Sequence, residues 1–231
     1  MGNETSKMKS EMWDNYQINI LEKSNESFKP GCIMNVDWHG LSHFRFNSVK
    51  GDTVVMIDSE FGEDWNIQTT SGSERFSQVS LNISVSSQNT LEAKIEELFH
   101  ITSKVDVSTT KRVSITIDTA RFSKIEDKSW HEIKEKIYAA SKADKDSDEH
   151  RFWHRVKDRC IITSVSFVKK VTFKFDSAGS VAPKVDVKIT GKEVDLEDSS
   201  AWKDDNTFVA SYPDTHTVPF ALQCVRVKNC I

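Results

Sequence analysis

The chain has 231 residues, which is enough for one sizeable hydrophobic core or two small ones. Its formal net charge of -4 argues against a general nucleic-acid-binding protein, which would carry an excess of basic residues. The sequence contains no apolar run near the ~18 residues of a membrane-spanning helix. It also has no signal-peptide pattern at its start, so we expect a cytoplasmic protein.

The first third of the chain is predicted to form short strands separated by turns. Residues 1–14 are polar and bear lysines, and they are expected to form a short N-terminal segment. Short alternating or apolar runs predict strands at 16–21, 44–46 and 53–57. Two turn-forming sequences, Lys50-Gly51-Asp52 and Ser71-Gly72-Ser73, are expected to interrupt the chain.

The clearest pattern is a pair of two-faced strands around a short helix. On residues 76–85 apolar side chains alternate with serine and asparagine, and residues 112–118 repeat the alternation with serine and threonine. Between them a short amphipathic helix is predicted over residues 91–99. The apolar face of this strand pair comprises Val79, Leu81, Ile83, Val85, Val113, Ile115 and Ile117.

Helices and a second pair of two-faced strands are predicted in the rest of the chain. Helical spacing of apolar residues predicts a helix over 128–142, and residues 151–157 are expected to add a second helical turn or two. Alternation predicts strands at 164–175 and 185–189, followed by an acidic loop at 191–206. The apolar face of this second pair comprises Val165, Phe167, Val171, Phe173, Phe175, Val185, Val187 and Ile189.

A last strand is predicted at 219–227, and the whole order predicts an α+β fold with a central twisted antiparallel sheet flanked by helices. The alternation has two interpretations. A sheet in water needs one apolar face against a core, and a membrane-inserted sheet needs one apolar face against lipid. Roughly 9–11 residues of tilted strand span a bilayer. The segments 76–85 and 164–175 are about that long, so alternation alone leaves both interpretations open.

The order of these elements resembles the pore-forming domain of the gasdermin family, in the short forms of bacteria, fungi and early-branching animals. The resemblance starts at residues 15–21 and is clearest from Phe152-Trp153 through 161–165 into the long strands. It closes on residues 219–227, an apolar segment followed by an arginine between aliphatic residues. It implies that residues 1–231 form a single gasdermin-like domain. Residues 1–14 would then be its membrane-proximal segment and residues 228–231 a short C-terminal tail.

The resemblance also implies a function. Protomers would wait in the cytoplasm, bind acidic phospholipid at the cell membrane, and assemble into homo-oligomers or hetero-oligomers with a related chain. Each would insert two amphipathic β-hairpins, 76–85 with 112–118 and 161–175 with 184–194, and so permeabilise the membrane. The expected outcome is pyroptosis-like lytic cell death in innate immunity.

The resemblance leaves the activation mechanism open. Familiar gasdermins of animals carry an inhibitory C-terminal domain that a protease releases, and this chain stops where the pore domain is expected to end. A partner, a lipid or thiol redox chemistry would then control it. The four cysteines form no CxxC pair and are expected to be free thiols in a reducing cytosol. Among them, Cys224 and Cys230 are candidates for a disulfide that fixes the last strand or links two chains.

Contacts with lipid are predicted from the N-terminus and from clustered cations. The sequence Met1-Gly2-Asn3-Glu4-Thr5-Ser6 fits the N-myristoylation pattern, which predicts lipidation of Gly2. Basic residues nearby would supply a second membrane signal. An ordinary solvated face is the alternative for every cation. The candidate lipid-binding residues are Lys7, Lys9, Lys111, Arg112, Arg151, Arg155, Lys157 and Arg159.

No motif predicts catalysis or a cofactor, because GxSxG, HExxH and phosphate-loop sequences do not occur. The pairs His39/His43 and His150/His154 have the i, i+4 spacing that could hold a metal on a helix. Gly40 argues against a helix for the first pair, and the second has no obvious third ligand, so no metal site is predicted. The alternative function is a non-lytic, soluble β-rich binding or interaction module.

Overall fold

The computed structural model describes residues 19–21, 27–38, 46–74, 80–84, 92–93, 95–96, 99, 101–106, 108–177, 185–188, 200–213 and 218–231. The chain divides into two compact units. Unit 1 comprises residues 1–26, 73–121 and 166–220. Unit 2 comprises residues 27–72, 122–165 and 221–231.

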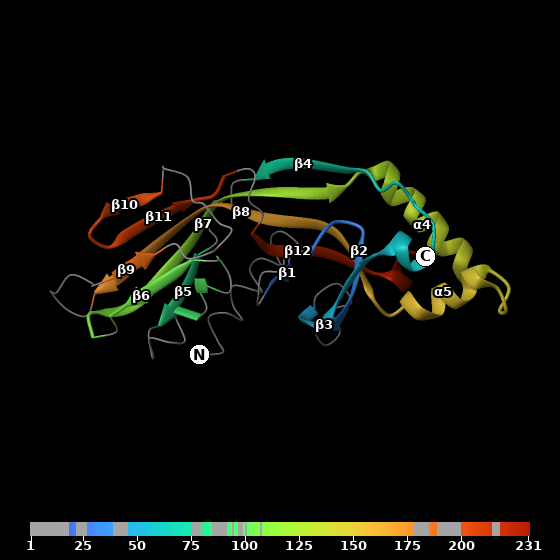
Figure 1. The fold of residues 1–231 in the computed structure, drawn as a ribbon, viewed down its shortest axis with the longest axis horizontal. Coiled ribbons are helices and arrows are strands. Elements are labelled where there is room, and N and C mark those ends of the chain that lie inside the picture. Colours follow the sequence, from blue (N-terminus) through green and yellow to red (C-terminus); the bar gives the residue numbers. More distant parts are fainter. Residues whose placement is uncertain are drawn as a thin grey trace. The chain divides into compact units, whose positions relative to one another are not determined.

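Two long, paired strands supply sheet to both units (Figure 1). They are β7 (Thr110–Ile125) and β8 (Cys160–Ser177). Both contain the alternating sequences that predict two-faced strands, and both are longer than those sequences alone suggest. The expected α+β fold with a large antiparallel sheet is confirmed.

In unit 1, short strands extend the sheet. β5 (Ser80–Ser84) pairs antiparallel with β7, as the first predicted strand pair requires. β11 (Thr207–Ser211) pairs antiparallel with β8, and β10 (Ala201–Asp204) pairs with β11 and ends that path of strands. A separate two-stranded sheet joins β6 (Thr102–Val105) to β9 (Val185–Lys188).

The last strand, β12 (Pro219–Arg226), runs beside β8 and confirms the strand predicted at 219–227. Its other neighbour is β1 (Asn19–Ile20), where the N–H of Leu21 donates to the carbonyl of Phe220 at 2.9 Å. This pairing brings the two ends of the described chain into one sheet.

In unit 2, β2 (Cys32–Trp38) pairs antiparallel with β3 (Phe46–Met56) and, at Ile33 and Met34, with β8. β4 (Thr69–Glu74) pairs with β7. These strands form the sheet against which the helices of unit 2 pack.

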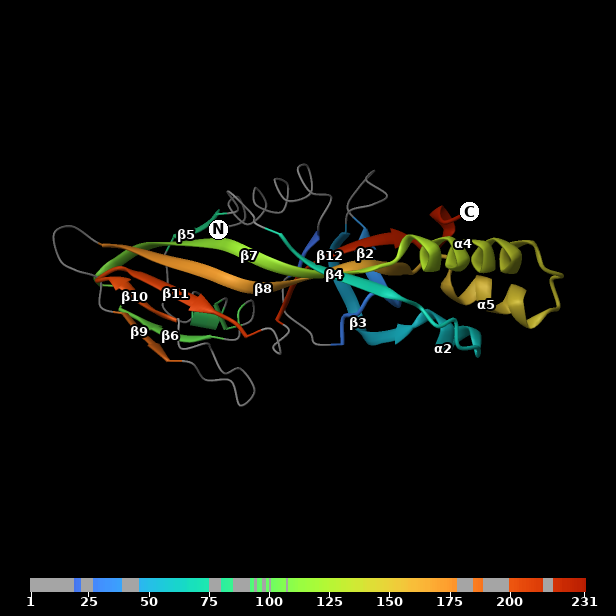
Figure 2. The ribbon, with the colours of Figure 1, turned by 90° about the horizontal axis from the view of Figure 1, so that it is seen from above.

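The helices of unit 2 are α2 (Ile57–Phe61), α4 (Asp127–Lys142) and α5 (Asp148–Val156). The predicted helix over 128–142 is confirmed as α4, and Figure 2 shows α4 and α5 next to one another. The N-terminus of α5 is capped by Ser147, whose hydroxyl accepts from the N–H of His150 at 3.1 Å.

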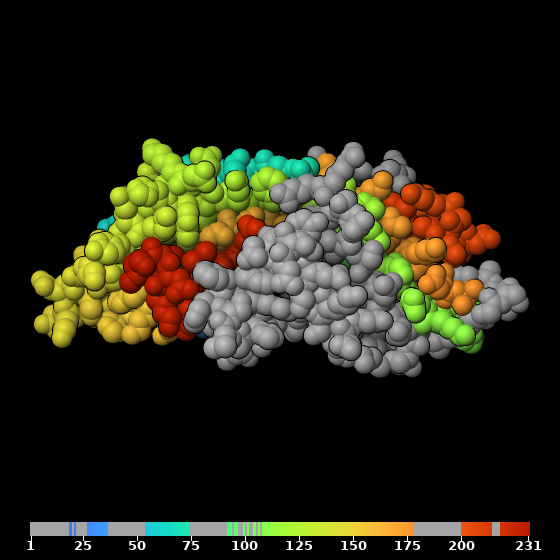
Figure 3. Space-filling view, turned by 180° about the vertical axis from the view of Figure 1, so that it is seen from behind, coloured from blue at the N-terminus to red at the C-terminus, as the bar shows by residue number. Residues whose placement is uncertain are grey.

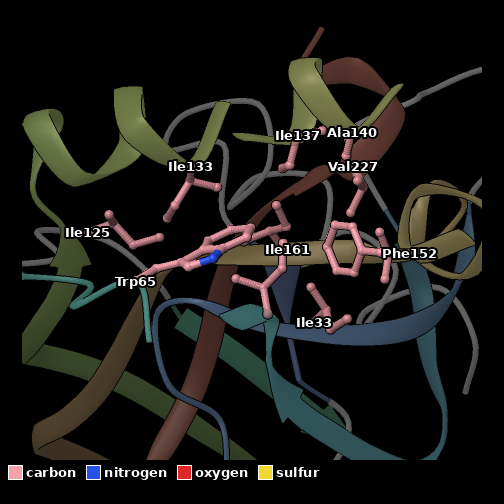
Figure 4. Close-up of a cluster of buried hydrophobic side chains, with 11 residues drawn as sticks. Ile33, Trp65, Ile125, Ile133, Ile137, Ala140, Phe152, Ile161 and Val227 are labelled. Carbon is pink, nitrogen blue, oxygen red and sulfur yellow. The ribbon is translucent and has the colours of Figure 1, made fainter. Parts of the chain in front are cut away.

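The core of unit 2 lies between α4, α5 and the sheet (Figure 4). One stripe of α4 at helical spacing, which includes Ile133 and Ile137, is buried there, because that spacing places residues on one face. Phe152 from α5 is 2 % exposed and lies edge-on to the rings of Phe61 and Trp65. Full burial of such aromatic side chains contributes about 1.5–3 kcal/mol each.

A short 3₁₀ turn, η1 (Val227–Asn229), closes unit 2 at the C-terminus. Val227 is fully buried in the core, and its N–H donates to the carbonyl of Arg159 at 3.0 Å. The N–H of Lys228 donates to the carbonyl of Lys157 at 3.1 Å. Figure 3 shows this segment in red, beside the yellow-green residues of α4.

Three sequence predictions about local structure are wrong. The turn at 50–52 does not split a strand, because β3 runs through it and the pairing with β2 shifts register there. The sequence 71–73 lies inside β4, and β10 lies inside the region predicted as an acidic loop. Gly72 marks close packing instead of a turn, since a Cβ there would lie 2.6 Å from Cζ of Phe122.

Candidate functional site

The candidate site is the face of β7 and β8 in unit 1, over residues 110–121 and 166–177. At about 3.3 Å per residue each segment is ~40 Å long. Each segment therefore has slightly more residues than the roughly 9–11 that a tilted membrane-spanning strand needs. The hydroxyl of Thr172 donates to Asp118 Oδ2 at 2.6 Å. This contact places the even-numbered side chains of both strands on one face, so the odd-numbered side chains share the other.

The odd-numbered face is mostly apolar and buried, although Lys111, Thr119, Arg121 and Lys169 at odd positions are exposed or partly exposed. The predicted membrane-inserting residues of β7 and β8 on this face are all less than a tenth exposed. They are Val113, Ile115, Ile117, Phe167, Val171, Phe173 and Phe175, and the predicted residue Val165, which belongs to unit 2, is buried as well. Across the register, Phe208 of β11 lies opposite Phe173 and Ala210 lies opposite Val171, which extends the same apolar face. In this state the face is therefore covered by protein.

Side chains from other parts of unit 1 supply this cover. The ring of Phe99 meets the ring of Phe173 edge-on, with the centroids 5.4 Å apart. The carbonyl of Phe99 accepts a hydrogen bond of 2.7 Å from the hydroxyl of Tyr212, which is itself buried. Burial raises the pKa of Tyr212 well above its usual value, so this hydroxyl stays a donor. Residues 92–93, 95–96 and 99 are helical, in agreement with the predicted short helix.

The hairpin β10–β11 widens this apolar face at its edge, because Trp202 lies opposite Phe208 in the register and Phe208 lies opposite Phe173. Trp202 of β10 lies 5.9 Å from Phe175 and 5.4 Å from Phe208 between ring centroids, yet 40 % of its surface stays exposed. The alternation of apolar residues does not predict this hairpin, because the region reads as an acidic loop. A usable signal was Asp204, whose carboxylate accepts from the N–H of Asn206 at 2.9 Å and forms the turn between two aromatic-bearing strands.

The even-numbered face carries partly exposed polar side chains in the middle of β7 and from Lys170 onward on β8, whereas Ala120 and Val168 at even positions are buried. Ser114, Thr116 and Asp118 of β7 are partly exposed, as are Lys170 and Thr172 of β8. The alternation fails at the start of β8, where Ser164 and Ser166 are buried as well as their apolar neighbours. The amphipathic part of β8 is therefore shorter than the strand.

The second predicted strand pair does not form in this state. Val185 and Val187 lie in β9, which pairs with β6, while β11 occupies the place beside β8. Since several strands of this chain alternate, local pattern alone does not select the partner. Leu81 and Ile83 lie in β5, which pairs with β7 as expected. The predicted residues Val79, Val85 and Ile189 lie outside the described residues.

The predicted lipid-binding cations fall into two groups. Lys111 and Arg112 are exposed at the start of β7 in unit 1. Arg151, Arg155, Lys157 and Arg159 belong to α5 and the residues after it in unit 2. Gly2, Lys7 and Lys9 lie outside the described residues.

Carboxylates compensate much of the charge in the second group. Arg159 forms an ion pair of 3.1 Å with Glu60 Oε1, and Arg155 Nε lies 3.9 Å from Glu60 Oε2. Arg155 also donates to the carbonyl of Glu60 at 3.1 Å. Arg151 pairs with Asp148. Glu60 carries no sequence signal for this role, because it lies far from these arginines in sequence.

The cysteines are free thiols. Burial raises the pKa of Cys160 well above its usual value, and the adjacent thiol of Cys224 acts in the same direction. Burial also raises the pKa of Cys230 to about 12. The neighbour of the Cys224 thiol is Cys160, and not Cys230 as the predicted disulfide would need. Because the pKa values of Cys160 and Cys230 are raised, few thiolates are available for disulfide exchange in this state.

Within the described part of the chain, no helix has the length and apolar character to cross a membrane, and no three potential metal ligands gather.

Comparisons with known proteins place the fold. No family model matches the sequence, and no curated protein matches it. The fold is similar to the structure of a bacterial gasdermin from Bradyrhizobium tropiciagri, with a TM-score of 0.50 and 12 % sequence identity. The match covers 94 % of this chain and 85 % of that chain. The resemblance noted in the sequence is therefore confirmed at the level of the fold.

Proposed function

From this gasdermin-like fold, we propose that the protein is a non-enzymatic pore-forming protein. It stays in the cytoplasm until activated, then binds acidic membranes, oligomerises, and inserts two amphipathic β-hairpins per protomer into the cell membrane. Permeabilisation by the assembled pores causes lytic cell death. The observation that carries this proposal is the buried apolar face of β7 and β8, which Phe99 contacts from a separate segment of unit 1.

Uncovering this face in water is unfavourable, which keeps the protein soluble. Full burial of a Val, Leu, Ile or Phe side chain contributes about 1.5–3 kcal/mol, so exposing Val171, Phe173 and Phe175 together would cost several kcal/mol. In a bilayer, lipid replaces the protein cover and the cost disappears. Membrane contact therefore supplies the free energy that favours the inserted state.

The antiparallel ladder suits insertion because it pairs the backbone without water. Each N–H and C=O group in a bilayer core needs an internal partner. The pairing of β5 with β7 provides one ladder, and β7 itself pairs with β8. Thr172 and Asp118 lie on the polar face, which would line the aqueous side.

Acidic lipid would be bound first by exposed cations. Lys111 and Arg112 are available at the start of β7. In the α5 group, a lipid phosphate would compete with Glu60 for Arg155 and Arg159, since arginine binds phosphate and carboxylate in the same geometry. The predicted lipidation of Gly2 and the lysines at positions 7 and 9 would add a second anchor.

Dye release from liposomes tests the proposal. We expect release from vesicles containing phosphatidylserine or cardiolipin and little release from pure phosphatidylcholine. Higher salt should reduce release because it screens the headgroup contacts. The absence of release at every lipid composition, with reductant and without it, would favour a non-lytic β-rich binding module instead.

A pair of substitutions on β8 tests which face enters lipid. Phe173→Asp places a charge on the apolar face, and Lys174→Asp places the same charge on the neighbouring exposed position. A charged side chain on the lipid-facing side of a strand is unfavourable at mid-bilayer, so Phe173→Asp should abolish release and Lys174→Asp should retain it. Circular dichroism and gel filtration would verify folding, with Val171→Asp as a second variant. Equal loss in both variants would contradict the assignment of faces.

A further inference from the structure

One side-chain pair outside the candidate site has the geometry of a chelate. His150 and His154 lie one turn apart on α5, within unit 2. Their Nε2 atoms are 3.0 Å apart and their ring centroids 4.7 Å apart. The spacing i, i+4 puts the two rings on the same face of the helix, and the cap by Ser147 fixes the first turn.

The distance between the two nitrogens constrains the metal they could share. Imidazole nitrogens bind first-row metals at about 2.0–2.1 Å. A metal bonded to both Nε2 atoms, held 3.0 Å apart, would have an N–metal–N angle of about 91–97°. A tetrahedral ion would need a separation of ~3.3–3.4 Å. The geometry therefore fits square-planar or tetragonal coordination, which Cu²⁺ and Ni²⁺ prefer.

The contacts of the two Nδ1 atoms determine whether each Nε2 atom has a free lone pair that can bind a metal. His150 Nδ1 is buried and has no hydrogen-bond partner in the protein, so a proton placed there leaves Nε2 with its lone pair for a metal. His154 Nδ1 lies 3.2 Å from Nζ of Lys157 and accepts from that ammonium group. Metal binding would move the proton of His154 from Nε2 to Nδ1, and Lys157, which is partly exposed, would have to turn away.

We propose that His150 and His154 form a bidentate site for a tetragonal divalent transition metal of the Cu²⁺ or Ni²⁺ class. Water fills the remaining positions. Neighbouring positive charge opposes binding only in part, because Arg151 pairs with Asp148 and Arg155 pairs with Glu60. The bound metal would link two consecutive turns of α5 and stabilise the folded state by an amount that rises with the logarithm of its concentration above Kd. The proposal does not rest on the proposed membrane function, although Lys157 beside His154 is also one of the candidate lipid-binding cations.

Isothermal titration of the untagged protein with Ni²⁺ tests the proposal. Ni²⁺ is the primary probe because Cu²⁺ can oxidise accessible thiols. We expect one equivalent to bind, and His150→Asn or His154→Asn should weaken binding on the order of 100-fold because each leaves a single ligand. His131→Asn is the matched control, since His131 is an exposed histidine on α4 that pairs with Glu135 at 3.2 Å.

A gain-of-affinity variant separates this site from nonspecific surface binding. Lys157→Gln removes the competing cation and offers a carbonyl that can accept from His154 Nδ1–H, so it should tighten binding several-fold. Electron paramagnetic resonance with Cu²⁺ should show a tetragonal spectrum with two nitrogen ligands. Binding unchanged in His150→Asn and His154→Asn, or reduced equally in His131→Asn, would overturn the proposal. Tighter binding of Zn²⁺ than of Ni²⁺ would overturn the tetragonal geometry.

Discussion

At the scale of single residues, Phe152 is the side chain around which the core of unit 2 is organised. It is 2 % exposed, and the rings of Phe61 and Trp65 lie edge-on to it at 4.8 Å and 6.2 Å between centroids. Such arrangements add to the stabilisation from area burial alone. The Nζ of Lys136 lies 5.0 Å from the ring of Trp65, so a cation also covers the cluster.

The first prediction concerns this residue. Phe152→Ala should lower the free energy of unfolding by about 3–5 kcal/mol, because it removes a buried ring and leaves a cavity. Tyr138→Ala on α4 is the control, since Tyr138 is 54 % exposed and its loss should cost less than about 0.5 kcal/mol. Urea denaturation followed by tryptophan fluorescence measures both. Similar midpoints for the two variants would contradict this account of the core.

At the scale of elements, the C-terminal turn is held against the corner between α5 and β8. Asp158 Oδ1 accepts from Arg226 at 3.0 Å and from Lys228 at 3.3 Å. Partial burial acts to raise the pKa of Asp158, but the hydrogen bond from Lys228 and the charges of Lys228, Arg226 and Lys157 outweigh it and lower the pKa. Because the pKa in the folded state lies below its unfolded value, the ionised carboxylate stabilises the folded state.

The second prediction follows from that direction. The stabilisation by Asp158 should be present above its unfolded pKa of about 3.9 and should vanish as the pH falls through the lower folded pKa. Asp158→Asn should therefore reduce stability at pH 7 by less than about 1 kcal/mol, since the pair is largely exposed. Urea midpoints of the variant and the wild type should converge toward pH 2.5. A difference that is the same at both pH values would exclude a role for the charge.

Also at this scale, the alternation of apolar and polar residues predicts burial better in β7 than in β8. In β7 the odd positions from Val113 to Ile117 are buried and the even positions are partly exposed, as alternation predicts. In β8 that rule holds from Val171 onward and fails near Ser166, because burial there extends to both faces. A pattern of period two predicts a strand and its faces but not what lies on either face.

At the scale of the whole molecule, the proposed conversion depends on how easily unit 1 releases the cover over its apolar face. Phe99 contacts this face directly, through the ring of Phe173 and through the hydrogen bond from Tyr212 to its carbonyl. Removing a cover destabilises the soluble state without altering the strands that would insert. Removing an equally large core residue elsewhere destabilises the molecule without uncovering them.

The third prediction uses this contrast. Phe99→Ala should accelerate dye release from acidic liposomes several-fold. The contact between Phe99 and Phe173 has to be broken before the face of β8 meets lipid, and the variant lacks this contact in the soluble state. Phe152→Ala in unit 2 should destabilise the protein comparably without accelerating release. Release kinetics at a temperature where both variants remain folded would measure the difference. Equal acceleration by both would indicate that release follows general unfolding and not uncovering of this face.

The sequence by itself determined the class of the fold, the helix α4, and the two-faced character of β7 and β8. These features follow from periodicity, which depends only on the order of side chains along a single element. For the same reason the sequence predicts that the alternating apolar residues of β7 and β8, such as Val113 and Phe175, lie on the apolar face of a strand. The helical spacing of His150 and His154 was equally visible.

The tertiary structure decided which strands are partners, what covers the apolar face and which charges are paired. β11 rather than β9 lies beside β8, Glu60 compensates Arg155 and Arg159, and Gly72 makes room for a ring. Each of these contacts joins segments that are distant in sequence. Many strands and charges could compete for each position, and only packing of the whole chain selects among them.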